Sequence, residues 1–112
     1  MSTGTAIAAR VRDGGSSAAA EVATSLARIQ AVEPKVNAFS SRLEDRAAKG
    51  ALRVDTHRKR AELSLAGVPF AVKNLFDVAG LPTLAGSKIE RDAAPASRDA
   101  ILIRRLEAAG AV

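Results

Sequence analysis

The sequence predicts an α/β fold in which a mixed sheet is covered by helices on both faces. Three observations predict it: a short run that is apolar on both faces, two helical patterns before this run, and a further amphipathic helix that leads into a second apolar run. Strands that are apolar on both faces are typical of sheets buried between helices. Alternation of such strands with helices is typical of layered α/β domains.

We expect the chain to be the N-terminal portion of a single longer domain. Residues 1–15 are expected to form a flexible lead-in, because glycines punctuate them and their apolar content is mostly alanine. Residues 16–61 are the helical part, and residues 65–112 hold the apolar strand, a long loop, a helix and the start of the next strand. That last apolar run stops at Val112 before it can pair.

Two helices are predicted in the helical part. The first is expected to begin at an N-cap, either Ser16 or Ser17, and to end before Pro34, because proline disrupts a helix interior. The second is expected over about residues 42–61, where apolar side chains recur at helical spacing.

The run from Gly67 to Phe76, GVPFAVKNLF, is predicted to be an interior strand. Pro69 cannot donate a ladder hydrogen bond, which places it at the start of the strand. Lys73 then falls at the carboxyl end, where open α/β sheets gather their ligands and chemistry. Lys73 is therefore the candidate functional residue.

The pattern alone leaves two interpretations of Lys73 open. The rarity of buried lysines favours a side chain that extends into solvent or pairs with Asp77. The alternative is a desolvated amine that accepts and returns a proton near neutral pH.

A long connection marked by glycine and proline is expected over residues 77–97. Loops of this length in compact folds are commonly functional or packed over a site. A final amphipathic helix is expected up to Ala109, with Ser97 or Asp99 as its cap and Gly110 as its stop.

The net charge of +5 argues weakly for a nucleic-acid partner, and other features argue against one. Residues 1–60 hold eleven Lys and Arg against six Asp and Glu, so the whole excess lies there. The three aromatic residues are phenylalanines, two of them in the apolar run, and form no stacking platform for bases. We interpret the basic cluster 57–60 as a solvated helix end and assign His57 no role.

Other function classes have no support in the composition. The chain has no cysteine, no run long enough to span a membrane, and no signal-peptide pattern, so we expect a cytoplasmic protein without a membrane partner. Ligand spacings for metals and phosphate-binding loops are missing, so no metal or cofactor is expected.

The segment LAGVPFAVKNLFDVAGLPTLAGSKI, residues 65–89, resembles the first conserved block of the amidase signature family. Residues 28–39 and 99–112 are similar to flanking parts of the same family. The resemblance implies the amidase signature fold and hydrolysis of carboxamide C–N bonds by a serine, a second serine in a cis peptide, and a lysine. Lys73 matches that lysine by its place in VPFAVK.

The resemblance assigns a catalytic role to Lys73 alone. Both serines and the oxyanion loop are expected beyond Val112, so the 112 residues by themselves are expected to be inactive. The stretch Gly14–Ser17 superficially resembles the family's serine-containing block, but it precedes the lysine and leads directly into a helix, so we interpret it as a cap.

Within the family, AVKNLFDVAG, TLAGSKI and RRLEAAGAV resemble members that hydrolyse a small linear amide such as 1-carboxybiuret. This implies a small-molecule amide substrate, and a small helical subunit or a second copy as protein partner. Two alternatives stay open. One is an A-type component of an amidotransferase, and the other is a non-catalytic module whose basic helices dock a partner.

Overall fold

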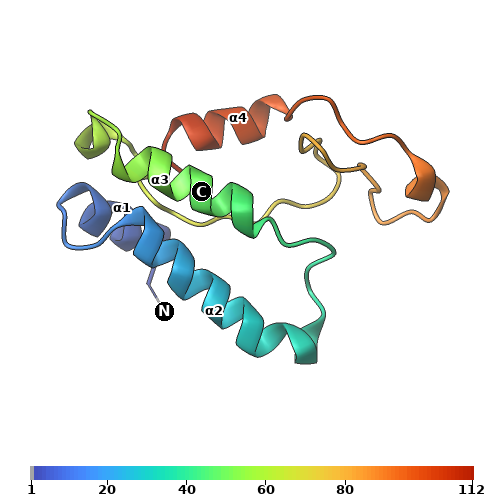
Figure 1. Cartoon of the computed structure of the whole chain (residues 1–112), viewed down its shortest axis with the longest axis horizontal. Helices are drawn as coiled ribbons and strands as arrows, with labels where there is room; N and C mark the ends of the chain where they lie inside the picture. Colours follow the sequence, from blue (N-terminus) through green and yellow to red (C-terminus); the bar gives the residue numbers. More distant parts are fainter. Residues whose placement is uncertain (1) are drawn as a thin grey trace.

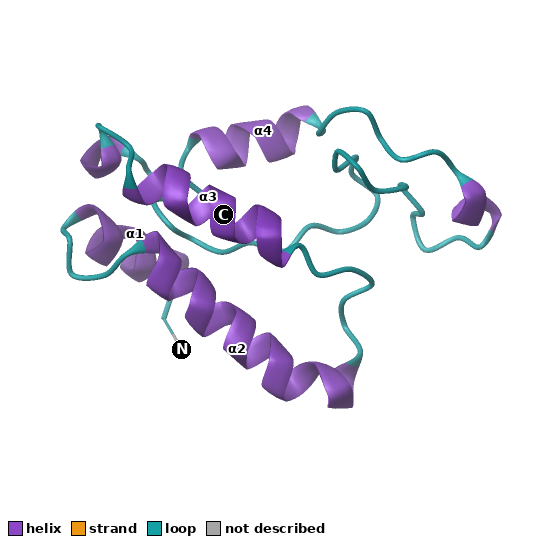
Figure 2. Ribbon diagram, in the orientation of Figure 1, coloured by secondary structure: helices purple, strands orange, loops and turns teal. Residues whose placement is uncertain are grey.

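The computed structural model describes residues 2–112 and consists of helices joined by extended loops (Figures 1 and 2). Four are α-helices, namely α1 (Gly4–Arg12), α2 (Ala18–Val36), α3 (Glu44–Asp55) and α4 (Ile101–Ala108). Two are short 3-10 helices, η1 (Arg60–Glu62) and η2 (Ile89–Asp92). Helices α2 and α3 pack against each other, and α1 lies against η1.

The predicted mixed sheet is wrong, because residues 2–112 contain no strand. The predicted interior strand over residues 67–76 is also wrong: up to Phe70 its backbone bonds to residues after α4, and from Lys73 it enters a turn. Phe70 N–H donates to Val112 O at 2.8 Å, and Val112 N–H donates to Val68 O at 2.9 Å. Within the described residues, the contact after the Gly110 turn involves Ala111 and Val112 and forms no ladder of several bonds.

Helix α1 occupies much of the expected flexible lead-in. The hydroxyl of Thr3 caps it by accepting from Ala6 N–H at 3.2 Å, and Ala8 and Val11 are buried on its inner face. Alanine is the strongest helix former, and here it is also small enough to allow close packing. The alanines on which the expectation of a flexible lead-in was based therefore lie in a helix.

Helix α2 begins where the sequence predicts. Ser17 is its N-cap and accepts from Ala20 N–H at 3.1 Å, which confirms the predicted cap. The carboxylate of Asp55 satisfies two more free donors, Ala18 N–H at 2.7 Å and Ala19 N–H at 3.0 Å. This second cap comes from the end of α3 and fixes the two helices together.

The predicted end of α2 before Pro34 is wrong, since the helix continues to Val36. Pro34 is exposed and lies in the last turn, where the loss of one hydrogen bond affects few residues. The helix ends at Asn37, whose N–H still donates to Glu33 O at 2.8 Å and whose left-handed backbone (φ 46°) then turns the chain away.

Helix α3 is shorter than the predicted 42–61, because the chain turns at Thr56 and re-forms a single 3-10 turn at η1. The core lies between α1, α2, α3 and the segment before Lys73. Its buried members are small, and they are Val11, Ala18, Val22, Ala51, Val54 and Ala66.

The final helix, α4, starts at Ile101 and has no side-chain cap, so the predicted caps Ser97 and Asp99 are wrong. Its end is as predicted: Gly110 follows the last turn with φ of 98°. The connection from Asp77 to Ala100 runs away from the helices and returns, carrying η2 at its far end (Figure 1).

Candidate active site

Lys73 lies in a tight turn directly after the extended apolar run. Its carbonyl accepts from Leu75 N–H at 2.7 Å and from Phe76 N–H at 3.2 Å. The side chain is exposed, so residues 2–112 do not desolvate its amine. In this part of the protein the solvent-exposed interpretation describes Lys73, and its catalytic role stays a prediction.

Asn74 holds this turn against the following loop through three hydrogen bonds. Its side-chain Oδ1 accepts from Leu84 N–H at 2.7 Å, and its Nδ2 donates to Pro82 O at 3.3 Å. Its backbone carbonyl accepts from Ala85 N–H at 2.7 Å. The residue next to Lys73 therefore fixes residues 82–85, and it does so with both ends of the amide group.

A second anchor follows at Asp77. Its carboxylate accepts from the hydroxyl of Thr83 at 2.5 Å, and among residues 2–112 it forms no ion pair with Lys73. Its carbonyl accepts from Ala100 N–H at 2.8 Å, at the entrance to α4. The side chain and the backbone of Asp77 thus connect the Lys73 turn to two different parts of the loop.

Arg46 on α3 forms the most extensive charged cluster near this loop. It donates to both carboxylate oxygens of Asp99, at 2.8 and 2.9 Å, and to Glu107 Oε1, at 3.0 and 2.7 Å. The hydrogen bonds from Arg46 lower the pKa of Asp99, while those to Asp99 and Glu107 raise the pKa of Arg46. Arg46 and Asp99 are therefore both charged at neutral pH.

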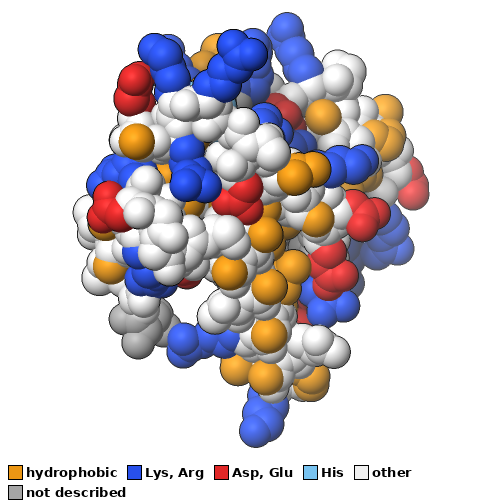
Figure 3. Space-filling view, turned by 60° about the vertical axis from the view of Figure 1, so that its left-hand side comes forward, with side chains coloured by type: hydrophobic (Ala, Val, Ile, Leu, Met, Phe, Trp, Pro, Cys, Tyr) orange, Lys and Arg blue, Asp and Glu red, His pale blue; other side chains and the backbone are white. Residues whose placement is uncertain are grey.

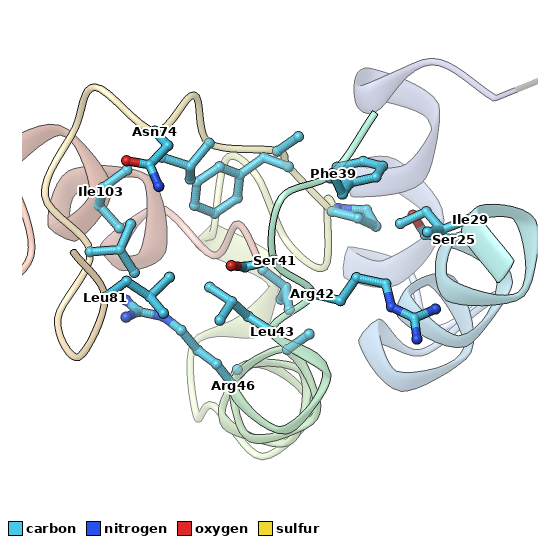
Figure 4. Close-up of a pocket in the computed structure, with 18 of the residues that line it drawn as sticks. Ser25, Ile29, Phe39, Ser41, Arg42, Leu43, Arg46, Asn74, Leu81 and Ile103 are labelled. Carbon is cyan, nitrogen blue, oxygen red and sulfur yellow. The ribbon is translucent and has the colours of Figure 1, made fainter. Parts of the chain in front are cut away.

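A partly open apolar cavity of about 180 Å³ lies beside the turn. Figure 4 shows Asn74 and Ile103 on one side of it and Ser25 and Ile29 of α2 on the opposite side. Val72 and Asn74, the neighbours of Lys73, line the cavity, whereas Lys73 does not. On the face drawn in Figure 3, apolar side chains gather in a band between charged ones.

The other residues weighed in the sequence do not join this site. Ser17 is occupied as the cap of α2. His57 is exposed, and its Nδ1 accepts from Lys59 N–H at 3.1 Å. Within residues 2–112, no three His, Cys, Asp or Glu side chains are grouped as a metal ion would require.

Comparison with known proteins identifies the family. The family model named Amidase matches residues 20–112. The chain belongs to the amidase family. This confirms the resemblance found in the sequence.

Two proteins of known name are similar in sequence to this chain. This amidase-family chain is 53% identical over 89 residues to the AtzE subunit of 1-carboxybiuret hydrolase from Pseudomonas sp. (strain ADP), an alignment that covers 78% of this chain and 20% of that protein. It is 48% identical over 93 residues to a glutamyl-tRNA(Gln) amidotransferase subunit of Anaeromyxobacter dehalogenans (strain 2CP-C), which covers 81% of this chain and 19% of that protein. The chain thus spans about a fifth of the length of these relatives.

Two solved structures share the arrangement of the helices. Both are described as a vestigial protein complex that reveals the evolutionary origins of an s-triazine catabolic enzyme. They match with TM-scores of 0.88 and 0.86 at 47% and 48% identity, and the second is an inhibitor-bound complex. The matches cover 95% and 92% of this chain and 24% and 23% of those chains.

The sequence motif makes Lys73 the candidate site residue, which stays a prediction, and it gives no indication of the residues that hold the following loop. In the sequence, Arg46 is only one cation of a predicted helix, and Asp99 is only a candidate helix cap. Their contact joins positions 53 residues apart, and no local spacing signals such a pair. Asn74 follows Lys73 directly, but its side chain bonds to residues 8 and 10 positions later, which a local turn signal does not indicate. No helix in the described part of the chain has both the length and the apolar character needed to cross a bilayer.

Proposed function

We propose that this amidase-family sequence forms the lysine-bearing part of an enzyme that hydrolyses amide C–N bonds through a Ser-cisSer-Lys triad. The observation that supports the proposal is Lys73 in the segment VPFAVK, inside the region matched by the family model. The two serines and the oxyanion donors would come from parts of a full-length chain outside these 112 residues.

In the proposed reaction, Lys73 acts in its neutral form. The amine accepts a proton through the bridging serine while the nucleophilic serine attacks the carbonyl carbon, and backbone N–H groups hold the oxyanion. When the C–N bond breaks, the proton passes to the departing amine, and water then hydrolyses the acyl-enzyme. A lysine performs this step and an arginine does not, because guanidinium keeps its proton at neutral pH.

This role requires that Lys73 lose its contact with water. The side chain is exposed when residues 2–112 are considered alone, so other parts of a full-length chain would have to cover it. Burial favours the uncharged form of an amine. The turn after the apolar run and the Asn74 contacts would then position Lys73, and the covering segments would remove water from its amine.

For the substrate, we propose a small linear amide of the 1-carboxybiuret type. Support comes from the 53% identity to one subunit of a 1-carboxybiuret hydrolase. We also propose a small partner protein, because the similar solved structures are of a protein complex. The 48% identity to a glutamyl-tRNA(Gln) amidotransferase subunit supports a second candidate, the amidotransferase reaction.

The experiment compares the full-length wild type with Lys73→Ala and Lys73→Arg, using carboxybiuret and glutamine as substrates. Lys88→Ala is the matched control, since Lys88 is another exposed lysine of the same loop. We expect kcat to fall on the order of 10²-fold in both Lys73 variants and to stay unchanged in the control. Near-wild-type activity of Lys73→Arg would exclude Lys73 as the proton acceptor.

The two substrates separate the candidates. Hydrolysis of carboxybiuret without glutamine use supports the small-amide hydrolase, whereas glutamine-dependent transamidation of glutamyl-tRNA supports the amidotransferase. Copurification of a small polypeptide in equal amounts would support the proposed partner, and recovery of a homo-oligomer alone would count against it.

A further inference from the structure

Asp99 lies directly before α4 but does not cap it. Helix α4 has no side-chain cap. Instead, Asp99 Oδ1 accepts from Ala79 N–H at 2.9 Å, and both carboxylate oxygens accept from Arg46. A carboxylate this close to a helix start ordinarily binds the free N–H groups there, so its use on the loop 20 residues earlier requires another explanation.

The loop segment that Asp99 contacts is bonded along its length to the segment before α4. Gly80 N–H donates to Ala96 O, and Ala96 N–H donates to Leu81 O, each at 2.9 Å. Ala100 N–H donates to Asp77 O at 2.8 Å. The Asp99 side chain closes the gap between these backbone contacts, so residues 77–81 and 96–100 form one unit.

This unit begins only four residues after Lys73. The intervening residues are held in a turn by the bonds from Leu75 and Phe76 to the Lys73 carbonyl. A shift of residues 77–79 therefore also moves the Lys73 backbone. Arg46 connects the same unit to α3, since its guanidinium contacts both Asp99 and Glu107 of α4.

We infer that Asp99, oriented by Arg46, is a positioning residue that fixes the Lys73 turn relative to α3 and α4. The inference rests on the proposed function of Lys73. Asp99 does not touch the reacting atoms in this scheme. It acts through the Ala79 hydrogen bond, and its loss displaces the amine. Misplacement of a catalytic group by about 1 Å can lower the rate as much as 10²-fold.

The chain contains a matched control for an effect on stability alone. Arg10 and Glu21 form a second two-bond arginine–carboxylate pair, at 2.7 and 2.8 Å, which joins α1 to α2. The Arg and acid side chains are 35% and 10% exposed, compared with 32% and 17% for Arg46 and Asp99. This pair has no hydrogen bond to the Lys73 loop in the described part of the chain.

The test measures kcat and KM of the full-length enzyme for Asp99→Ala, Asp99→Asn and Glu21→Ala. We expect Asp99→Ala to lower kcat at least 10-fold with KM changed less than twofold, and Glu21→Ala to leave kcat within twofold. Asp99→Asn keeps an oxygen for Ala79 N–H and should recover part of the lost kcat. Equal kcat values for Asp99→Ala and Glu21→Ala, or a change in KM alone, would overturn the inference.

Amide hydrogen exchange tests the positioning role of Asp99 separately from the proposed amidase function. In the full-length protein, the Ala79 amide should exchange at least 10-fold faster in Asp99→Ala than in wild type or Glu21→Ala. If the wild type has no amidase activity, the proposed function is wrong, and exchange still decides whether Asp99 fixes the loop. Unchanged exchange at Ala79 would refute the positioning role directly.

Discussion

Replacement of Gly67 by alanine should destabilise the protein by crowding the junction of α1, α2 and the extended run. Gly67 has a φ of 68° and is buried, and its N–H donates to Gly110 O at 2.9 Å. A Cβ at this position would lie 3.0 Å from both Ala18 Cα and Ala18 Cβ. It would also lie 3.1 Å from Val11 Cγ2. Because Ala18 Cα is backbone, the contact can be relieved only if the backbone of α2 or of the segment around Gly67 moves.

The expected cost combines two effects. A residue with a Cβ in the left-handed region costs roughly 1–2 kcal/mol, and overpacking a buried site costs about 1–3 kcal/mol. The lower entropy of the unfolded alanine chain offsets about 0.4–1 kcal/mol of this. We therefore expect Gly67→Ala to lower the free energy of unfolding by roughly 1–4.5 kcal/mol.

Gly86→Ala is the control that separates the two effects. Gly86 has a similar φ of 74°, but a Cβ there would meet nothing within 4 Å. Urea unfolding of the full-length protein, followed by circular dichroism, should show a small decrease in midpoint for Gly86→Ala and a much larger one for Gly67→Ala. Equal decreases would mean that the packing around Gly67 relaxes freely, and would refute the steric argument.

Two further predictions concern the loop and pH. Asn74→Asp removes the Nδ2 donor to Pro82 O and should lower stability by about 1 kcal/mol; a thermal midpoint at or above that of wild type would contradict this. Arg10 lowers the pKa of Glu21, so the stability that Glu21 adds is complete above its ordinary pKa of 4.5 and decreases as the pH falls below it. The test measures the free energy of unfolding of wild type and of Glu21→Gln at pH 7 and pH 3. The stability advantage of wild type should shrink at pH 3, and a larger advantage at pH 3 would contradict the prediction.

Local signals in the sequence predicted the boundaries that local chemistry sets. Ser17 caps α2 because its hydroxyl reaches a free N–H within the same turn, and Gly110 ends α4 because it adopts a left-handed backbone. Pro34 misled the prediction, because proline was taken to end the helix before it. Instead α2 accommodates Pro34 in its last turn and ends two residues later, at Val36.

Long-range contacts account for what the sequence did not reveal. The prediction of an interior strand at the apolar run was wrong, because a sheet also needs partner strands, and the alternation pattern does not indicate how many are present. The motif makes Lys73 a candidate, whereas the Arg46–Asp99 pair joins distant parts of the chain and has no local signal in the sequence. Asp99 in particular lies where an N-cap of α4 is expected, but in the structure it does not cap that helix.

The hydrogen bonds between the run before Lys73 and the residues after α4 also constrain the order of events during protein synthesis. The pairs join Leu65 to Ala109, Gly67 to Gly110, and Phe70 to Val112. As the chain leaves the ribosome, Lys73 emerges well before its neighbouring run has a partner. Closing a loop of about 40 residues costs little more entropy than closing a shorter one, so the delay is set by translation. During that interval the apolar run lacks these partners, and α1, α2 and α3 are the helices of the nascent chain that can already pack.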